Sequence, residues 1–172
     1  MRVIAGEFGG RKLVAPAGNT TRPTTDKVRQ AVFNSLGSIG VLDGAVVADL
    51  FAGSGALGIE ALSRGAERCL FVERDRAALN ALRANIDALH IEDRAAVHNS
   101  DVLAWVPAMR NVDIAFVDPP YAFDSWPALL AMLDVGMVVA EADDPVEAPD
   151  GWSQLRSRRY GRTWVSVLER LA

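Results

Sequence analysis

From Val46 onward the chain alternates between strand-like and helix-like segments. The strand-like runs are too apolar to face water on either side, which is typical of strands buried in a parallel sheet. This alternation predicts an α/β fold with a doubly wound, mostly parallel sheet, whose ligands bind beyond the carboxyl ends of the strands. The expected strands are AVVADLF (45–51), RCLFVE (68–73), AAVHN (95–99), VDIAFVD (112–118) and GMVVAEA (136–142).

The segment before this alternation predicts a small extension. RVIAGEFGGRKLV (2–14) alternates apolar and polar residues around a Gly-Gly pair, which indicates two short strands joined by a glycine turn. TTDKVRQAVFNSLGS (24–38) opens with threonines suited to capping and predicts an amphipathic helix that ends near Gly37. We therefore divide the chain into an N-terminal β-hairpin-plus-helix extension (1–40) and a main domain (41–172).

Two helices and one more hairpin are expected within the main domain. ALGIEALSRG (56–65) and DRAALNALRANIDALH (75–90) both read as helices, and the second repeats Leu and Ile at three- and four-residue steps. Such spacing predicts a single buried stripe. LRSRRYGRTWVSVLERL (155–171) contains two strand-like runs and indicates a hairpin that closes one edge of the sheet.

Length and composition fit one well-buried domain. The chain has 172 residues, of which 50% are hydrophobic. No apolar run reaches the roughly 18 residues of a membrane-spanning helix, and the first apolar run is too short for a secretory signal. We therefore expect a cytoplasmic protein that does not contact membranes. The single cysteine, Cys69, lies in an apolar strand, so we expect a small buried side chain and not a nucleophile.

Positive charge is concentrated at two places in a chain whose net charge is −4. Residues 1–30 carry six Lys or Arg against two acidic residues, which suits a basic arm on an acidic body. RSRRYGR (156–162) adds four arginines near the C-terminus. On charge alone, ordinary solvated surface is the favoured interpretation of both clusters.

A glycine loop follows the first expected strand. Gly53, Gly55 and Gly58 form a G-x-G-x-x-G pattern that opens a helix, and glycine there lets the backbone approach a ligand closely. Glu73 lies twenty residues after Gly53, at the end of the next strand, where a carboxylate can accept hydrogen bonds from ribose hydroxyls. The pattern therefore predicts a cofactor that contains a nucleoside.

The glycine pattern alone does not choose between a nicotinamide dinucleotide and S-adenosylmethionine. Asp49, at the tip of the first strand, would repel a pyrophosphate but attract an ammonium or sulfonium group. Asp101, just past the third strand, can receive an adenine edge or cap the following helix, and the two roles are compatible. The acids favour S-adenosylmethionine.

The fourth strand ends in Asp118-Pro119-Pro120-Tyr121. A base amine is a poor nucleophile, and two acceptors that each engage one N–H would favour a pyramidal nitrogen. The Asp118 carboxylate and the Pro119 carbonyl could be these acceptors, because the two prolines stiffen the backbone and supply no competing N–H. Tyr121 offers a ring on which a base turned out of its stack can lie.

These motifs resemble a known family. DLFAGSGALGIEALSRGA together with FVDPPY resembles the class I S-adenosylmethionine-dependent methyltransferases that act on exocyclic amines of bases. GGRKL and RPTTDKVRQAVFNSL resemble, more narrowly, the bacterial family that methylates N2 of one guanine in 16S ribosomal RNA. The likeness covers nearly the whole chain. The Asp-Pro-Pro-Tyr motif is shared with N6-adenine DNA methyltransferases, so it specifies an amine target rather than guanine.

The resemblance implies a role for each residue that matches a family motif. Cofactor contacts are implied at Asp49, Phe51, Gly53, Ser54, Gly55, Glu73, Arg74, Asp101 and Val102. Catalysis is implied at Asp118, Pro119, Pro120 and Tyr121. RNA contacts are implied at Arg11, Lys12, Arg22, Lys27 and Arg29, with Thr24 and Thr25 at the mouth of the active site.

The resemblance also implies a cofactor and a partner. The cofactor is S-adenosylmethionine, and the partner is 16S ribosomal RNA, within the 30S subunit or an assembly intermediate, bound by a monomer. An N6-adenine methyltransferase acting on DNA or RNA is the alternative, and a nicotinamide-dependent oxidoreductase or a non-catalytic RNA-binding module are further possibilities. His90 and His98 have no metal-like spacing with other ligands, so no metal site is expected.

Overall fold

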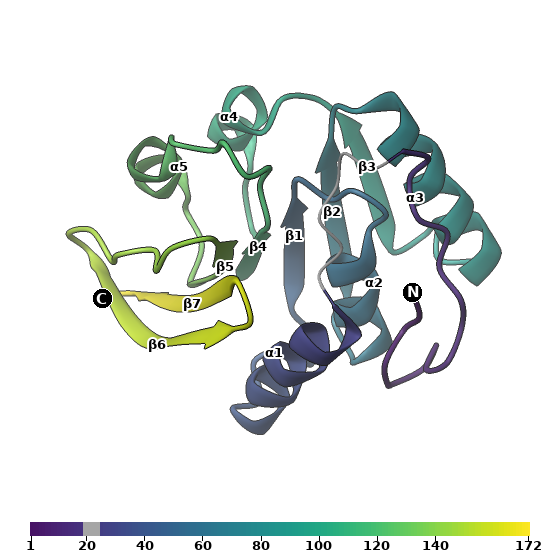
Figure 1. The fold of residues 1–172 in the computed structure, drawn as a ribbon, viewed down its shortest axis with the longest axis horizontal. Helices are drawn as coiled ribbons and strands as arrows, with labels where there is room; N and C mark the ends of the chain where they lie inside the picture. Colours follow the sequence, from purple (N-terminus) through teal and green to yellow (C-terminus); the bar gives the residue numbers. More distant parts are fainter. Residues whose placement is uncertain (19–24) are drawn as a thin grey trace.

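A single mixed sheet organises the molecule. A computed structural model describes residues 1–18 and 25–172, and its seven strands lie in the order β3-β2-β1-β4-β5-β7-β6 (Figure 1). Neighbours among β1 to β5 are parallel, whereas β7 is antiparallel to both β5 and β6. The predicted parallel sheet and the predicted edge hairpin are both confirmed. The strands are β1 (Val46–Leu50), β2 (Arg68–Glu73), β3 (Ala95–Asn99), β4 (Ile114–Val117), β5 (Met137–Ala142), β6 (Trp152–Tyr160) and β7 (Thr163–Arg170).

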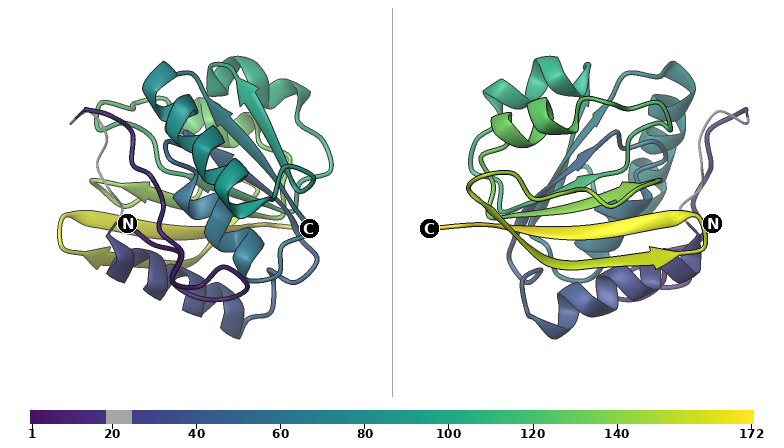
Figure 2. Two further views of the ribbon diagram at one scale, coloured as in Figure 1. Left: turned by 90° about the vertical axis from the view of Figure 1, so that its right-hand side faces the viewer. Right: turned by 60° about the vertical axis from the view of Figure 1, so that its left-hand side comes forward.

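Helices cover both faces of this sheet (Figure 2). One buried cluster joins the sheet to α1, α2 and α3, and a second joins the opposite face to α4, η1 and α5. No helix within residues 1–18 and 25–172 is both long and apolar enough to cross a membrane. The helices are α1 (Asp26–Ser38), α2 (Ala56–Ser63), α3 (Arg76–Leu89), α4 (Val102–Trp105), the 3₁₀ turn η1 (Val106–Ala108) and α5 (Trp126–Met132).

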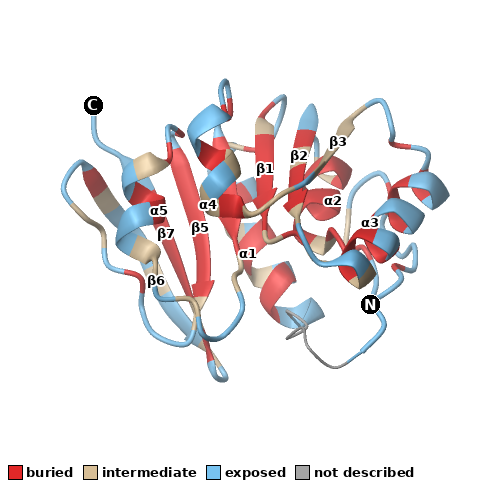
Figure 3. Ribbon diagram, turned by 90° about the horizontal axis from the view of Figure 1, so that it is seen from above, coloured by how far each residue is buried: buried red, intermediate tan, exposed pale blue. Residues whose placement is uncertain are grey.

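Strand β4 contributes to both clusters, which explains its unbroken apolar sequence. All four of its residues are buried, as are most residues of the neighbouring strands β1 and β5 (Figure 3). Successive side chains of a strand point to opposite faces of the sheet. Phe116 packs against Phe33 of α1 at 5.2 Å between ring centroids, whereas Val117 belongs to the cluster beneath α5. Burial on both faces holds the strand in place, and its carboxyl end is therefore a fixed platform.

The predicted helices form where their caps and stripes indicate. Thr25 caps α1 by accepting a hydrogen bond from the Val28 amide at 3.3 Å. Asp75 caps α3 by accepting from the Ala78 amide at 2.9 Å. The apolar stripe of α3 is buried in the core beneath it, as expected from its spacing.

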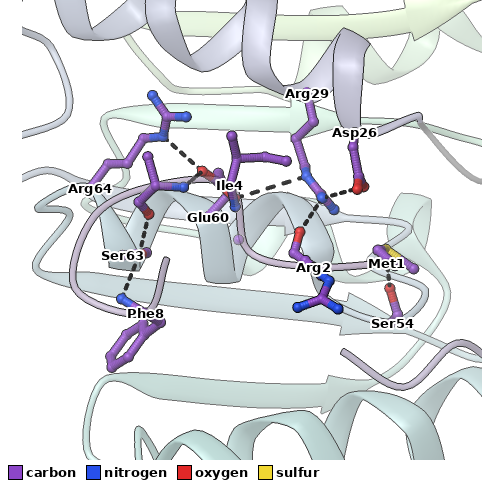
Figure 4. Close-up of polar contacts among 12 residues, drawn as sticks. Met1, Arg2, Ile4, Phe8, Asp26, Arg29, Ser54, Glu60, Ser63 and Arg64 are labelled. Atoms are coloured by element: carbon purple, nitrogen blue, oxygen red, sulfur yellow. Dashed lines mark hydrogen bonds and ion pairs between the residues drawn. The ribbon is translucent and has the colours of Figure 1, made fainter. Parts of the chain in front are cut away.

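The N-terminal segment pairs with itself but forms no regular strand. The predicted hairpin is reduced to one antiparallel bridge between Arg2 and Lys12. The reason lies in helix α2, whose Glu60 carboxylate accepts hydrogen bonds from the amides of Ile4 and Ala5 at 2.8 and 3.2 Å (Figure 4). Backbone donors that a strand would need are thus bound to side chains of α2.

Close packing against α2 also explains a glycine in this segment. A Cβ at Gly6 would lie 1.9 Å from the Ser63 carbonyl oxygen, so no other residue fits there without displacing the helix. Val3, Phe8 and Leu13 belong to the same buried cluster as α1, α2 and α3. The extension therefore shares the main hydrophobic core, and the division of the chain at residue 40 stays a prediction.

Candidate active site

A large cleft opens at the carboxyl ends of the parallel strands, where the strand order reverses on either side of β1. Its volume is about 1500 Å³. Every residue expected to bind the cofactor or act in catalysis lines this cleft, except Gly55, which caps the start of α2. Thus the fold brings together residues from four strand ends that are separated by up to 72 positions in the sequence. The lining residues among them are Asp49, Phe51, Gly53, Ser54, Glu73, Arg74, Asp101, Val102, Asp118, Pro119, Pro120 and Tyr121.

The glycine loop is held by carboxylates rather than left open to anions. The Gly53 amide donates to Glu73 Oε2 and the Gly58 amide donates to Asp49 Oδ2, each at 2.9 Å. The Gly55 amide donates to the Ala52 carbonyl at 2.8 Å. All three glycine amides therefore donate to acceptors within the protein, and two of these acceptors are carboxylate oxygens.

The third glycine serves packing. A Cβ on Gly58 would lie 2.4 Å from the Phe71 ring and 2.5 Å from the Cys69 sulfur, so α2 can approach β2 only because no side chain intervenes. Cys69 is buried, as predicted, and burial raises the pKa of its thiol well above the ordinary value. This thiol is therefore a packing group and not a nucleophile.

Asp49 is a buried carboxyl group at the floor of the cleft, with 1% of its surface exposed. Burial raises the pKa of Asp49 well above its ordinary value, and the Gly58 amide opposes this shift by stabilising the carboxylate. The charges of Asp118 and Glu73 raise the pKa further. A cation bound in the cleft would favour ionisation of Asp49, whereas an anion would be repelled.

Glu73 and Asp101 occupy the ends of the next two strands. Glu73 Oε1 accepts hydrogen bonds from the amides of Arg74 and Asp75, each at 2.8 Å, so the carboxylate is fixed at the rim. Asp101 caps α4 by accepting from the Ala104 amide at 3.2 Å, and it also pairs with Arg74 at 3.0 Å. The expected capping role of Asp101 is confirmed, and the side chain remains on the wall of the cleft.

Three aromatic residues form one wall of the cleft: Phe51, which the resemblance implied as a cofactor contact, and Phe123 and Trp126, which were not predicted. Phe51 has a left-handed φ of 61° and packs edge-on against Phe123 at 5.2 Å. Phe123 in turn meets Trp126 at 5.4 Å. A positive φ in a non-glycine residue costs energy, and strained residues of this kind cluster at active sites and ligand-binding loops. Two aromatic residues within five positions after Tyr121 were the sequence signal for this wall.

The Asp-Pro-Pro-Tyr segment stands at the mouth of the cleft, directly after β4. Asp118 and Pro119 are half-buried, whereas Tyr121 is 65% exposed. The Pro120 carbonyl accepts from the Phe123 amide at 3.0 Å and closes a turn. No described residue donates a hydrogen bond to the Pro119 carbonyl oxygen. The segment therefore places a carbonyl acceptor, a carboxylate and an exposed aromatic ring side by side.

The N-terminal segment covers one end of the cleft, where Ala15 and Pro16 belong to the lining. Asn85 of α3 holds it there. Asn85 accepts from the Val14 amide at 2.7 Å and donates to the carbonyls of Val14 and Ser54, each at 2.9 Å. One buried amide side chain thus joins the N-terminal segment to the glycine loop, a link that no local motif indicated.

The structure contradicts one of the predicted RNA contacts. Arg29 is fully buried on the inner face of α1, where its guanidinium pairs with Asp26 at 2.8 Å and hydrogen-bonds to the Arg2 carbonyl (Figure 4). Glu60 lies 3.9 Å from its Nε. Burial lowers the pKa of Arg29, and the charges of Glu60, Asp26 and Glu141 oppose the shift. Arg29 is a structural residue because its helical position faces the core.

The remaining predicted RNA contacts lie at different ends of the molecule. Lys27 is exposed in the first turn of α1. Arg11 and Lys12 are exposed too, but Arg11 donates to the Ala88 carbonyl at 2.8 Å, near the end of α3. At 1.5 Å per residue, that point is roughly 18 Å from the cleft end of α3. Arg22 and Thr24 lie outside the described residues.

Comparisons with known proteins agree with this geometry. The model of a family described as Conserved hypothetical protein 95 matches residues 1–169. YlbH of Bacillus subtilis, whose name proposes an rRNA methyltransferase, is 41% identical, with 99% of each chain covered. Ribosomal RNA small subunit methyltransferase D of Escherichia coli K12 is 36% identical over all of this chain and 91% of its own. A solved Escherichia coli structure described as a methyltransferase superposes with a TM-score of 0.86 at 34% identity, covering 100% and 98% of the two chains.

The fold and site define an S-adenosylmethionine-dependent methyltransferase. Its parallel sheet has a glycine loop after β1, an acid at the end of β2 and a cleft at the carboxyl ends of these strands, and its relatives are methyltransferases. Within this class, the match over nearly the whole chain is decisive. The protein belongs to the Conserved hypothetical protein 95 family, the family of ribosomal RNA small subunit methyltransferase D.

Proposed function

We propose that this protein transfers a methyl group from S-adenosylmethionine to the exocyclic N2 amine of a guanine in 16S ribosomal RNA. The observation that carries the proposal is the Asp118-Pro119 acceptor pair at the end of β4, in the same cleft as the glycine loop and beside the exposed ring of Tyr121. Relatives named for methylation of small-subunit ribosomal RNA support the choice of substrate.

The residues of the cleft suit S-adenosylmethionine better than a dinucleotide. The glycine amides that would bind a pyrophosphate are engaged by Glu73, Asp49 and the Ala52 carbonyl. Carboxylates of Asp49, Glu73 and Asp101 line the space, and they suit ribose hydroxyls, an adenine amine and the cationic amino-acid end. These contacts argue against a nicotinamide-dependent oxidoreductase.

When bound, S-adenosylmethionine supplies an activated methyl group on a positively charged sulfur. The chain's own residues orient the acceptor: the Asp118 carboxylate and the Pro119 carbonyl each accept one N–H of the target amine, which directs the nitrogen lone pair out of the ring plane. Tyr121 stacks on the base, a contact worth roughly 1–3 kcal/mol. The wall of Phe51, Phe123 and Trp126 excludes water from the reacting atoms.

We further propose that the protein acts as a monomer in the cytoplasm, on 16S ribosomal RNA within the 30S subunit or an assembly intermediate. Residues 1–40 would form an RNA-contacting extension on the methyltransferase domain of 41–172. Exposed Lys27 and Lys12 are the side chains of that extension best suited to contact phosphates. Activity on assembled subunits compared with naked RNA would identify the true substrate.

The test of the proposed function is a nucleoside analysis. Small subunits from cells that lack the enzyme are incubated with the protein and methyl-labelled S-adenosylmethionine, and the RNA is digested. We expect N2-methylguanosine as the labelled product, and labelled N6-methyladenosine or an unlabelled digest would contradict the proposal. Asp118→Ala should abolish labelling while it leaves cofactor binding intact, whereas Asp124→Ala, on the exposed loop nearby, should remain active.

A further inference from the structure

The C-terminal hairpin carries a group of arginines whose position has a functional meaning. Strand β7 is antiparallel to β5, and Trp164 at its start pairs with Ala142 at the end of β5. The end of β4 pairs with β5 at Val117 and Ala140. The turn that joins β6 to β7 therefore lies at the same edge of the sheet as the Asp-Pro-Pro-Tyr segment.

The distance between the two is short. Strands β4 and β7 are separated only by β5, and neighbouring strands lie about 4.8 Å apart, so β7 is about 10 Å and β6 about 14 Å from β4. Tyr121 is exposed at this edge, which is where a target base would enter. Nucleotides next to such a base would pass the tip of the hairpin.

The tip of the hairpin is basic and exposed. Arg158 and Arg159 lie near the end of β6, an edge strand, and Arg162 lies in the turn; all three are exposed. Arg158 sits over the Tyr160 ring at 5.5 Å, and Arg159 donates to the Gly161 carbonyl at 2.9 Å. None of the three forms an ion pair with a carboxylate among the described residues. Their charges are therefore not neutralised by the fold.

Helix α1 extends this basic tip. A small hollow between α1 and the hairpin is lined by Ala31 and Ser35 on one side and by Arg158 and Tyr160 on the other. The first turn of α1 lies on the same side as the hairpin turn, as both views in Figure 2 show. Lys27 in that first turn is exposed. We name these cations the hairpin ledge: Lys27, Arg158, Arg159 and Arg162.

Acidic residues around the hairpin ledge leave the ledge as the surface near the mouth of the cleft that attracts anions. The loop after β5 lines the cleft and carries Asp144 and Glu147, which would repel phosphate. Asp26, next to Lys27, is paired with buried Arg29. A polyanion that approaches the mouth would thus be repelled from the acidic loop and attracted to the ledge.

We infer that the hairpin ledge binds the phosphodiester backbone of the RNA next to the target base. This inference rests on the proposed function and adds the C-terminal hairpin to the substrate-binding surface. These arginines have no carboxylate partners, so we expect them to bind phosphates through their charge. Phosphate contacts position the RNA but do not select its sequence. The ledge is closer to the mouth than Arg11, which is fixed near the far end of α3.

The inference is tested with the double variant Arg158→Glu/Arg162→Glu. RNA affinity is measured by fluorescence anisotropy on a 16S ribosomal RNA fragment between about 50 and 200 mM salt, a range over which affinity due to phosphate contacts falls steeply. We expect the Kd for RNA to rise at least about tenfold and the salt slope to fall by about 1.4, at about 0.7 per lost phosphate contact on a single strand. The KM for RNA should rise while kcat and cofactor affinity stay unchanged.

Two control variants separate a charge effect from a structural one. Arg68→Glu reverses an exposed charge at the start of β2, on the opposite edge of the sheet, and should leave RNA affinity and salt slope unchanged. Arg158→Lys/Arg162→Lys keeps the charges and should retain most of the affinity. An unchanged Kd and salt slope for the glutamate variant would overturn the inference. Failure of this inference can be told apart from failure of the proposed function. If the proposed function were wrong, the wild-type protein itself would not methylate ribosomal RNA.

Discussion

At the scale of single residues, the site combines a buried acid with a rigid acceptor. Asp49 is almost inaccessible and Asp118 is half-buried, and each lies at the end of a strand that is fixed on both faces. A carboxyl group as deeply buried as Asp49 is costly to ionise. The cost is consistent with a site that a cationic ligand completes.

Asp49→Asn should stabilise the protein at neutral and alkaline pH. Burial raises the pKa of Asp49 in the folded protein above that in the unfolded chain, so protonated Asp49 favours the folded state. This contribution to the free energy of unfolding is fully present below the ordinary carboxyl pKa. It is lost as the pH rises through the higher pKa of the folded state. Asparagine can still accept the Gly58 hydrogen bond but cannot ionise. We expect a higher Tm than wild type at pH 8, a smaller difference near pH 4, and weaker cofactor binding. A Tm that is equal or lower at pH 8 would contradict this account.

Arg29→Ala should destabilise the fold without a direct effect on RNA binding. Removing one partner of a buried ion pair leaves an uncompensated charge, which costs about 3–5 kcal/mol. Because Glu60 keeps Arg64 as a partner at 2.8 Å, we expect the lower end of that range in urea unfolding. The exposed neighbour Lys27→Ala should change stability by no more than about 0.5 kcal/mol. A loss below about 1 kcal/mol in Arg29→Ala would show that the buried cluster is dispensable.

At the scale of elements, the strands and long helices follow from patterns that local sequence contains. β4 is continuous and apolar because two helix layers bury it, and α3 has caps and a stripe long enough to show a period. The short elements α4, η1 and α5 have four, three and seven residues, too few to reveal a helical period. The N-terminal alternation indicated strands, but α2 engages the amides that strands would use.

The same reasoning explains which site residues could be predicted. The glycine loop and the Asp-Pro-Pro-Tyr segment carry their chemistry within a few consecutive residues, so one sequence suffices. Asn85 lies 71 positions from Val14 and 31 positions from Ser54, the two residues that it joins, and nothing in its own helix indicates a role. The burial of Arg29 was predictable from the sequence, since Arg29 shares the inward face of α1 with Phe33, four residues further on. Arg29 was nevertheless predicted to contact RNA, because it belongs to the basic cluster near the N-terminus.

Asn85→Ala should loosen the link between the N-terminal segment and the glycine loop. The substitution leaves the Val14 amide, the Val14 carbonyl and the Ser54 carbonyl without this partner, and such groups cost about 1–3 kcal/mol when they stay buried. We expect faster amide exchange at residues 13–18 and about five- to tenfold weaker binding of S-adenosylhomocysteine. Asn80→Ala, exposed on the same helix, should change neither. Equal exchange rates in the two variants would refute the link.

At the scale of the whole molecule, cofactor and fold stabilise one another. The cleft lies where both hydrophobic clusters meet the carboxyl edge, so a ligand there contacts elements on each face of the sheet. A ligand that binds only the folded state at 100 times its Kd adds about 2.7 kcal/mol of stability. For a chain of this size, 1 kcal/mol corresponds to about 2–4 °C in Tm.

S-adenosylhomocysteine at that excess should therefore raise the Tm by about 5–11 °C in thermal unfolding. NAD at the same concentration should have no effect, since the glycine amides are engaged by protein acceptors. Asp118→Ala should keep the shift, because Asp118 acts on the target amine. Stabilisation by NAD and not by S-adenosylhomocysteine would reject the cofactor assignment.

The docking of the N-terminal segment on α2 and α3 also constrains how the protein is made. Val14 is translated 71 residues before Asn85, its hydrogen-bond partner. At about 5–20 residues per second, the nascent segment waits roughly 4–14 s before that partner leaves the peptidyl-transferase centre. Helix α2 is synthesised before Asn85, so the N-terminal segment can contact α2 before α3 fixes it beside the glycine loop.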